Sequence, residues 1–151
     1  MSANETFTAD VIRDFHFLEE EYGMRREPAA VSGGGLWLIW ANANAKVIVE
    51  REIGGHCGVT VVNVRHVKRD PLDRGEFDLE EIIALSGQKQ GGRRQEPRSM
   101  TEAVARAAQT LRSVGARVLG GDFEALQTKQ RQRVEELRRH HPLQDHKEPE
   151  K

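Results

Sequence analysis

Positions 36–50 read LWLIWANANAKVIVE, and this stretch decides the fold. It begins with a short apolar run whose length and aromatic content favour a strand over a helix. Asn42-Ala43-Asn44 then predicts a turn, because asparagine tolerates left-handed backbone conformations. Ala45, Val47 and Val49 recur at every second position after the turn, which is the period of a strand. A connection this short predicts that the two strands are antiparallel.

Two further segments extend this pair of strands. Residues 59–67 are rich in β-branched residues and follow a glycine-rich turn at 54–58, which predicts another strand. Residues 24–31 predict a first strand, and Pro28 would confine it to an edge of the sheet. Together these segments predict an antiparallel meander of three to four strands.

Helical patterns lie on both sides of the strand block. Before it, Val11, Phe15, Leu18 and Tyr22 recur at helical spacing and predict a helix over residues 9–22, with Thr8 as its N-cap. After it, capping-box pairs predict helices at 79–86 and 99–114. These pairs are Asp78 with Glu81 and Ser99 with Glu102.

A last helix is predicted to begin after Asp122 and to end before Pro142. Gln130 interrupts its apolar seam, so we expect this helix to be only half docked, and its free apolar positions suggest a homodimer contact. Strands grouped together with helices outside them indicate an α+β fold. We predict one domain over residues 1–141, with two to three C-terminal helices packed on the sheet, and a disordered polar tail at 142–151.

The charge of the chain is balanced only as a total. With 23 Lys+Arg against 24 Asp+Glu the net charge is −1, which excludes a protein that is basic throughout. Residues 5–21 nevertheless carry a net charge of −5, and residues 89–139 carry +6. If the two regions lie on different surfaces, each is a candidate docking face for a partner of opposite charge. If they lie together, they neutralise each other within the fold. The candidate partner-binding residues are Asp14, Glu19, Glu20, Glu21, Arg93, Arg94 and Arg98.

The candidate chemistry is sparse. Cys57 is the only cysteine, so no internal disulfide can form. A small enzyme could use His56, Cys57 and His66, although adjacent residues in extended chain point to opposite faces. His140, His141 and His146 match no closed zinc site. We therefore expect no catalytic residues, no metal and no cofactor.

Location is predicted from two weak signals. The polar N-terminus lacks the pattern of a signal peptide. The longest apolar run, residues 36–41, is too short to cross a bilayer. We expect a cytoplasmic protein that makes no membrane contact.

Nucleic-acid binding is an alternative function. It would use the basic 87–98 loop and the last helix, which hold many of the twelve basic residues between positions 89 and 139. Several of these arginines have carboxylates at helical spacing, for example Arg139 beside Glu135. We therefore favour protein binding over nucleic-acid binding.

The segments 15–23, 37–49, 77–85 and 111–123 together resemble a family of small bacterial proteins of uncharacterised function, chiefly actinobacterial. Such proteins are similar in size and layout to the immunity proteins of bacterial toxin systems. The resemblance implies stoichiometric binding of a toxin rather than catalysis. It carries over no toxin-binding residue, because its pattern consists of core positions. We therefore expect a non-enzymatic, immunity-like module that binds a protein partner such as a toxin.

Overall fold

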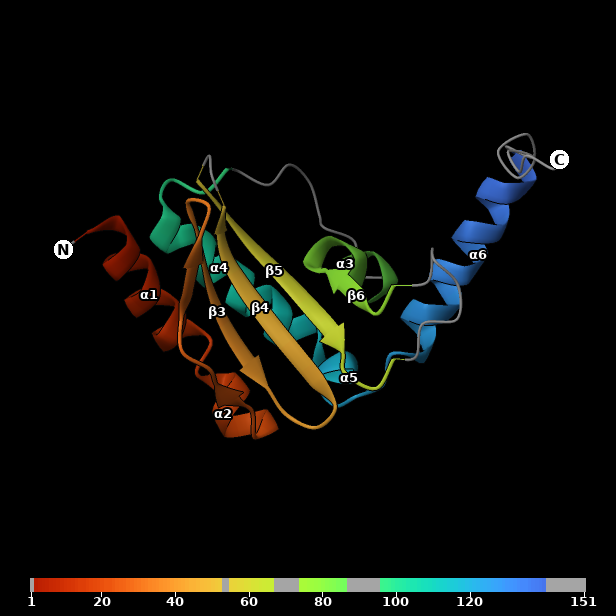
Figure 1. Ribbon diagram of the computed structural model, residues 1–151, viewed down its shortest axis with the longest axis horizontal. Coiled ribbons are helices and arrows are strands. Elements are labelled where there is room, and N and C mark those ends of the chain that lie inside the picture. Colours follow the sequence, from red (N-terminus) through yellow and green to blue (C-terminus); the bar gives the residue numbers. More distant parts are fainter. Residues whose placement is uncertain (1, 53–54, 67–73, 87–95, 141–151) are drawn as a thin grey trace, which may run out of the picture.

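The computed structural model describes residues 2–52, 55–66, 74–86 and 96–140. An antiparallel sheet is covered on one face by helices, so the α+β prediction is confirmed (Figure 1). The strand order is β1-β3-β4-β5-β6, and β2 also pairs with β3. The strands are β1 (Arg25–Arg26), β2 (Ala30–Ser32), β3 (Gly35–Ala41), β4 (Ala45–Glu52), β5 (His56–Asn63) and β6 (Glu76–Asp78).

The predicted meander forms the centre of the sheet, as β3, β4 and β5. The turn between β3 and β4 is closed by Asn42, whose Oδ1 accepts from the backbone N–H groups of Asn44 at 2.8 Å and Ala45 at 2.9 Å. Its Nδ2 donates to the Tyr22 carbonyl at 3.0 Å. The asparagine therefore sets the turn and also joins it to the N-terminal helical segment.

The covered face of the sheet forms the core. Alternate residues of the central strands point into it, and α1 (Ala3–Asp14) and α4 (Met100–Val114) lie against them. The fully buried members are Phe7, Val11, Leu38, Trp40, Val47, Val49, Val61, Val104 and Leu111. Burying large apolar side chains of this kind is the main source of stability, at about 1.5–3 kcal/mol for each one.

The predicted 9–22 helix is wrong in its boundaries. Two helices occupy this region, α1 and α2 (Phe17–Tyr22), with a break at Phe15–His16. Thr8 does not cap the first helix. Ser2 does so, through a capping box in which its hydroxyl accepts from the Glu5 N–H and the Glu5 carboxylate accepts from the Ser2 N–H. The apolar stripe still turns inward, because Phe15 and Leu18 are both fully buried.

The edges of the sheet also differ from the prediction. The predicted first strand is divided into β1 and β2 on either side of Pro28, and both lie at the β3 edge. β5 ends at Asn63, short of the predicted residue 67. Asn63 Oδ1 there accepts from the Arg65 N–H at 3.2 Å, which turns the chain out of the sheet.

The helices after the sheet begin where their capping residues predict. α3 (Leu79–Ser86) follows the reciprocal Asp78–Glu81 hydrogen bonds, and Ser99 caps α4. A short α5 (Ala116–Leu119) leads to α6 (Glu124–His140), which contacts α3 and then projects from the body of the molecule (Figure 1). The predicted tail at 142–151 lies outside the described residues. Within the described ranges, no helix combines the length and the apolar content that a membrane crossing requires.

Candidate functional site

The predicted acidic docking face is largely used inside the fold. Glu19 accepts a hydrogen bond from the indole Nε1 of buried Trp40 at 3.1 Å. Glu21 is paired with Arg112, and Asp14 accepts from the Nε of Arg13 at 2.9 Å. Glu20 is the most exposed of the four, and its carboxylate lies 3.9 Å from His16 Nε2. Glu19 and Glu21 therefore hold α2 against the sheet and α4, whereas Asp14 and Glu20 lie close only to residues near them in the chain.

Of the predicted basic docking residues, the structure describes Arg98. Arg93 and Arg94 lie outside the described residues. Arg98 is exposed just before α4, and its backbone N–H donates to Glu102 at 3.4 Å. The two charged regions do meet at one place, since Arg112 of α4 reaches Glu21 and also lies 5.6 Å from the Phe17 ring centroid.

The histidines and the cysteine do not form a catalytic set. His56 and Cys57 begin β5 and point to opposite faces, while His66 lies beyond the far end of that strand, which spans about 24 Å. Burial, assisted by nearby Glu52, raises the pKa of the Cys57 thiol to about 12. The thiolate that a nucleophile requires is therefore disfavoured at neutral pH. Among the residues described, no three His, Cys, Asp or Glu side chains are grouped so as to hold a metal ion.

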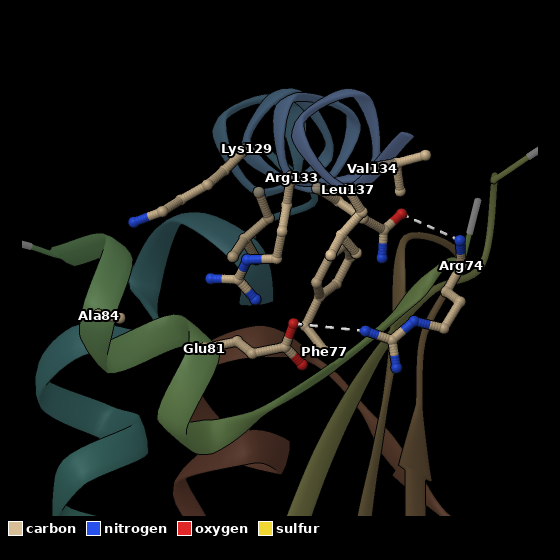
Figure 2. A pocket seen from close by; sticks show the side chains of 10 residues that line it. Arg74, Phe77, Glu81, Ala84, Lys129, Arg133, Val134 and Leu137 are labelled. Carbon is tan, nitrogen blue, oxygen red and sulfur yellow. Dashed lines mark hydrogen bonds and ion pairs between the residues drawn. The ribbon is translucent and has the colours of Figure 1, made fainter. Parts of the chain in front are cut away.

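The structure instead contains a pocket of about 260 Å³ between α6 and the β6–α3 segment (Figure 2). We call it the α3–α6 pocket. Its apolar lining residues are Phe77, Ala84, Leu126, Val134 and Leu137. Its polar lining residues are Arg74, Glu81, Lys129, Gln130 and Arg133.

The pocket forms because α6 extends away from the core while its apolar side chains continue along one face of the helix. Phe123 precedes α6 and stacks on Phe77 with ring centroids 6.1 Å apart, which docks the start of the helix. Leu126, one turn on, is 4% exposed, whereas Leu137 near the other end is 55% exposed. The apolar face of α6 is thus buried at the start of the helix and exposed near its end. The pocket lies between these two parts, where α6 diverges from α3.

One wall of the pocket carries an unused hydrogen-bond donor. The backbone N–H of Arg74 donates to Gln130 Oε1 at 2.9 Å, which fixes the orientation of that amide. Gln130 Nε2 is then buried and, within the part of the chain described, has no hydrogen-bond partner. A buried donor without a partner costs about 1–3 kcal/mol, so an acceptor that reached Gln130 Nε2 from the pocket would recover that cost.

The charges around the pocket are unbalanced. Its one carboxylate, Glu81, lies 3.6 Å from Arg74 (Figure 2, dashed line). Lys129 and Arg133 have no carboxylate within ion-pair distance among the described residues. Figure 2 shows the Arg133 side chain extending from α6 toward α3, so that its positive charge lies at the pocket. The site suits a ligand that is apolar in part and negatively charged in part.

Sequence reasoning missed this pocket, although one signal for it was present. Gln130 stands in the seam of α6 with Val134 and Leu137 after it, and we interpreted it only as a weak point in docking. The residues opposite, Phe77 and Ala84, come from a distant segment, and no local pattern pairs them with α6.

Comparison with known proteins adds no family or relative. The chain matches no family model, no curated protein and no solved structure.

Proposed function

We propose that the protein is a non-enzymatic binding module that holds an acidic segment of a protein partner in the α3–α6 pocket. The observation that carries this proposal is the unpaired Nε2 of Gln130 beside an apolar pocket flanked by Lys129 and Arg133. A carboxylate of the partner would accept from Gln130 and neutralise the two cations. An apolar side chain next to that carboxylate would fill the space between Phe77 and Val134.

The surroundings of the pocket favour a protein segment over a free small molecule. The exposed Leu137 extends the apolar surface beyond the pocket itself. An apolar anchor site with a basic rim has the composition of a protein interface.

The resemblance to immunity proteins makes a bacterial toxin the partner class that we propose. An immunity protein works by stoichiometric binding and needs no catalytic group of its own. The scattering of His56, Cys57 and His66 in the fold is compatible with such a role.

Site-specific photo-crosslinking tests the proposal. Leu137 is 55% exposed and Val31, on the sheet edge, is 65% exposed, so they form a matched pair of exposed aliphatic residues. A benzophenone amino acid at position 137 should crosslink a partner protein in the producing cell, and the same group at position 31 should not. The position-137 adduct should disappear in the K129E/R133E variant, because the pocket loses its attraction for a carboxylate.

The crosslinking result can also contradict the proposal. Equal adducts at both positions, or an adduct that survives K129E/R133E, would reject the α3–α6 pocket as the binding site. An adduct at twice the 17.0 kDa of one chain would instead support the predicted homodimer through the last helix.

Nucleic-acid binding through α6 remains the second hypothesis, because Lys129 and Arg133 are unpaired among the described residues. A salt titration of a labelled duplex separates the two. Binding to nucleic-acid phosphates requires an affinity that falls steeply as salt is added and that is similar for any nucleotide sequence. Binding in the pocket requires both the carboxylate and the apolar side chain of the protein partner.

A further inference from the structure

The face of the sheet turned away from α1 and α4 is a second surface that lacks a partner among the described residues. We call it the open face. Figure 1 looks onto it: β3, β4 and β5 lie in front of α4, and no labelled helix lies in front of them. Its residues on these three strands are Trp37, Ile39, Ala41, Lys46, Ile48, Glu50, Gly58, Thr60 and Val62.

The composition of the open face is unusual for a solvated sheet. Antiparallel sheets with one face in water normally alternate apolar inward and polar outward. Here the middle row, Ile39–Ile48–Thr60, is mainly apolar, and Trp37 and Val62 extend it to either side. These side chains are only half-buried, and no described helix covers them. Apolar side chains on an uncovered face of a sheet are candidates for an interaction surface.

The register of the strands favours a second copy of this chain as the occupant. Row by row, Ala41, Lys46 and Val62 lie on one side of the middle row. Trp37, Glu50 and Gly58 lie on the other side. Two copies can be placed face to face about a two-fold axis that lies in the interface, runs perpendicular to the strands and passes through Ile48. Each outer row of one copy then lies over the other outer row of the second copy.

Every central position then meets a complementary one. Lys46 faces Glu50 of the second copy, and the reverse contact forms as well, while Ile48 packs on its own equivalent. The bulky Trp37 lies over the small Ala41 of the other copy. Complementarity of charge and of size in the same arrangement is what a self-associating face requires.

The outer positions limit the contact. Val62 would lie over Gly58, where the end of the exposed Glu52 side chain is the nearest group and must move aside. Asp78 of β6 would approach its own equivalent, but sheet twist separates the edges of two packed sheets. The contact is therefore centred on β3, β4 and β5.

We propose that two copies of this chain associate through the open face, with Lys46 of each copy paired to Glu50 of the other. This interface is independent of the α3–α6 pocket. Strand and residue spacings give its central contact a footprint of about 15 Å by 17 Å, which is small beside the ~800 Å² per partner of stable complexes. The dimer is accordingly reversible and dissociates on dilution.

Charge reversal tests the pairing directly. The mass of the full chain is measured by analytical ultracentrifugation over about 10 µM to 1 mM, a range that detects weak association. The wild type should move from 17.0 kDa toward twice that mass as concentration rises. K46E and E50K should each weaken the dimer about tenfold or more, because each places like charges opposite one another.

Two restorations distinguish this arrangement from other dimers. The K46E/E50K double variant should dimerise like the wild type, since the opposite charges face each other again. An equimolar mixture of K46E and E50K should form a heterodimer although each alone is weakened. Circular dichroism checks that every variant is folded.

Other results overturn the proposal. A wild type that remains at 17.0 kDa throughout the range would reject it. A dimer that resists both single reversals, or that is lost in L137D while K46E leaves it intact, would place the contact elsewhere. Failure here leaves the crosslinking test of the α3–α6 pocket unaffected, because that test uses other residues.

Discussion

The acidic helix α2 and the basic helix α6 each carry several charged residues, but the fold uses the two sets of charges in opposite ways. In α2, Glu19 and Glu21 are satisfied by Trp40 and Arg112, so their charges stabilise the structure. In α6, Lys129 and Arg133 have no partner among the described residues and border a pocket. A charged run becomes a candidate binding site only where the tertiary structure leaves it without an internal partner.

The largest expected difference between the two helices is the loss of stability when a leucine of each is replaced by alanine. Leu18 of α2 is fully buried, so Leu18→Ala should lower the free energy of unfolding by about 2–5 kcal/mol. Leu137 of α6 is 55% exposed, so Leu137→Ala should change it by less than about 0.5 kcal/mol. Urea unfolding measures both. A comparable loss in the two variants would mean that the end of α6 is part of the core.

The next effect concerns the hydrogen bond between α2 and the sheet. Glu19→Ala leaves the indole N–H of fully buried Trp40 without its acceptor, which should cost about 1–3 kcal/mol. Glu19→Gln keeps an acceptor and should recover most of the loss. Glu20→Ala is the matched control, since its side chain is 68% exposed. If E20A and E19A unfold at the same urea concentration, Glu19 has no structural role.

A smaller effect is expected for the ion pair that joins the two charged regions. The side chains of Arg112 and Glu21 are 61% and 39% exposed, and exposed pairs contribute about 0.2–1 kcal/mol. A double-mutant cycle with Arg112→Ala and Glu21→Ala should give a coupling energy in this range that falls as salt is added. Coupling that does not respond to salt would indicate a contact other than charge attraction.

The smallest effect on stability should come from the pocket. Gln130→Met removes the unpaired buried donor and also the solvent-exposed bond to Arg74, so the two changes should cancel to within about 1 kcal/mol. The position-137 crosslink should nevertheless be lost. A strongly destabilised Gln130→Met would show that this amide serves the fold and not a partner.

Much of the fold was predictable because its signals are local. The β3–β4 turn follows from Asn42, and the starts of α3 and α4 follow from capping boxes within four residues of chain. The first helix was misplaced because Ser2 and Glu5 carry the same signal further upstream than the stripe that we used. The break after α1 was not predicted, because Val11, Phe15 and Leu18 are all buried and the apolar stripe therefore continues through the break.

The candidate site was much less predictable than the fold. The predicted docking residues included Glu19 and Glu21, whose partners lie 21 and 91 positions away in the chain. The α3–α6 pocket joins Phe77 to Val134, and the open face joins strands by register. Contacts over such separations depend on packing, which a local pattern does not encode.

The sequence by itself determined the α+β class, the central meander and the opposed charges of its two regions, because periodicity, turn residues and charge are properties of short segments. Only the tertiary structure decided which charges are neutralised inside and which face outward. It also decided that helices cover one face of the sheet and leave Trp37, Ile39 and Ile48 on the other. The reason is physical: whether a donor, a cation or an apolar face has a partner depends on what the folded chain places opposite it.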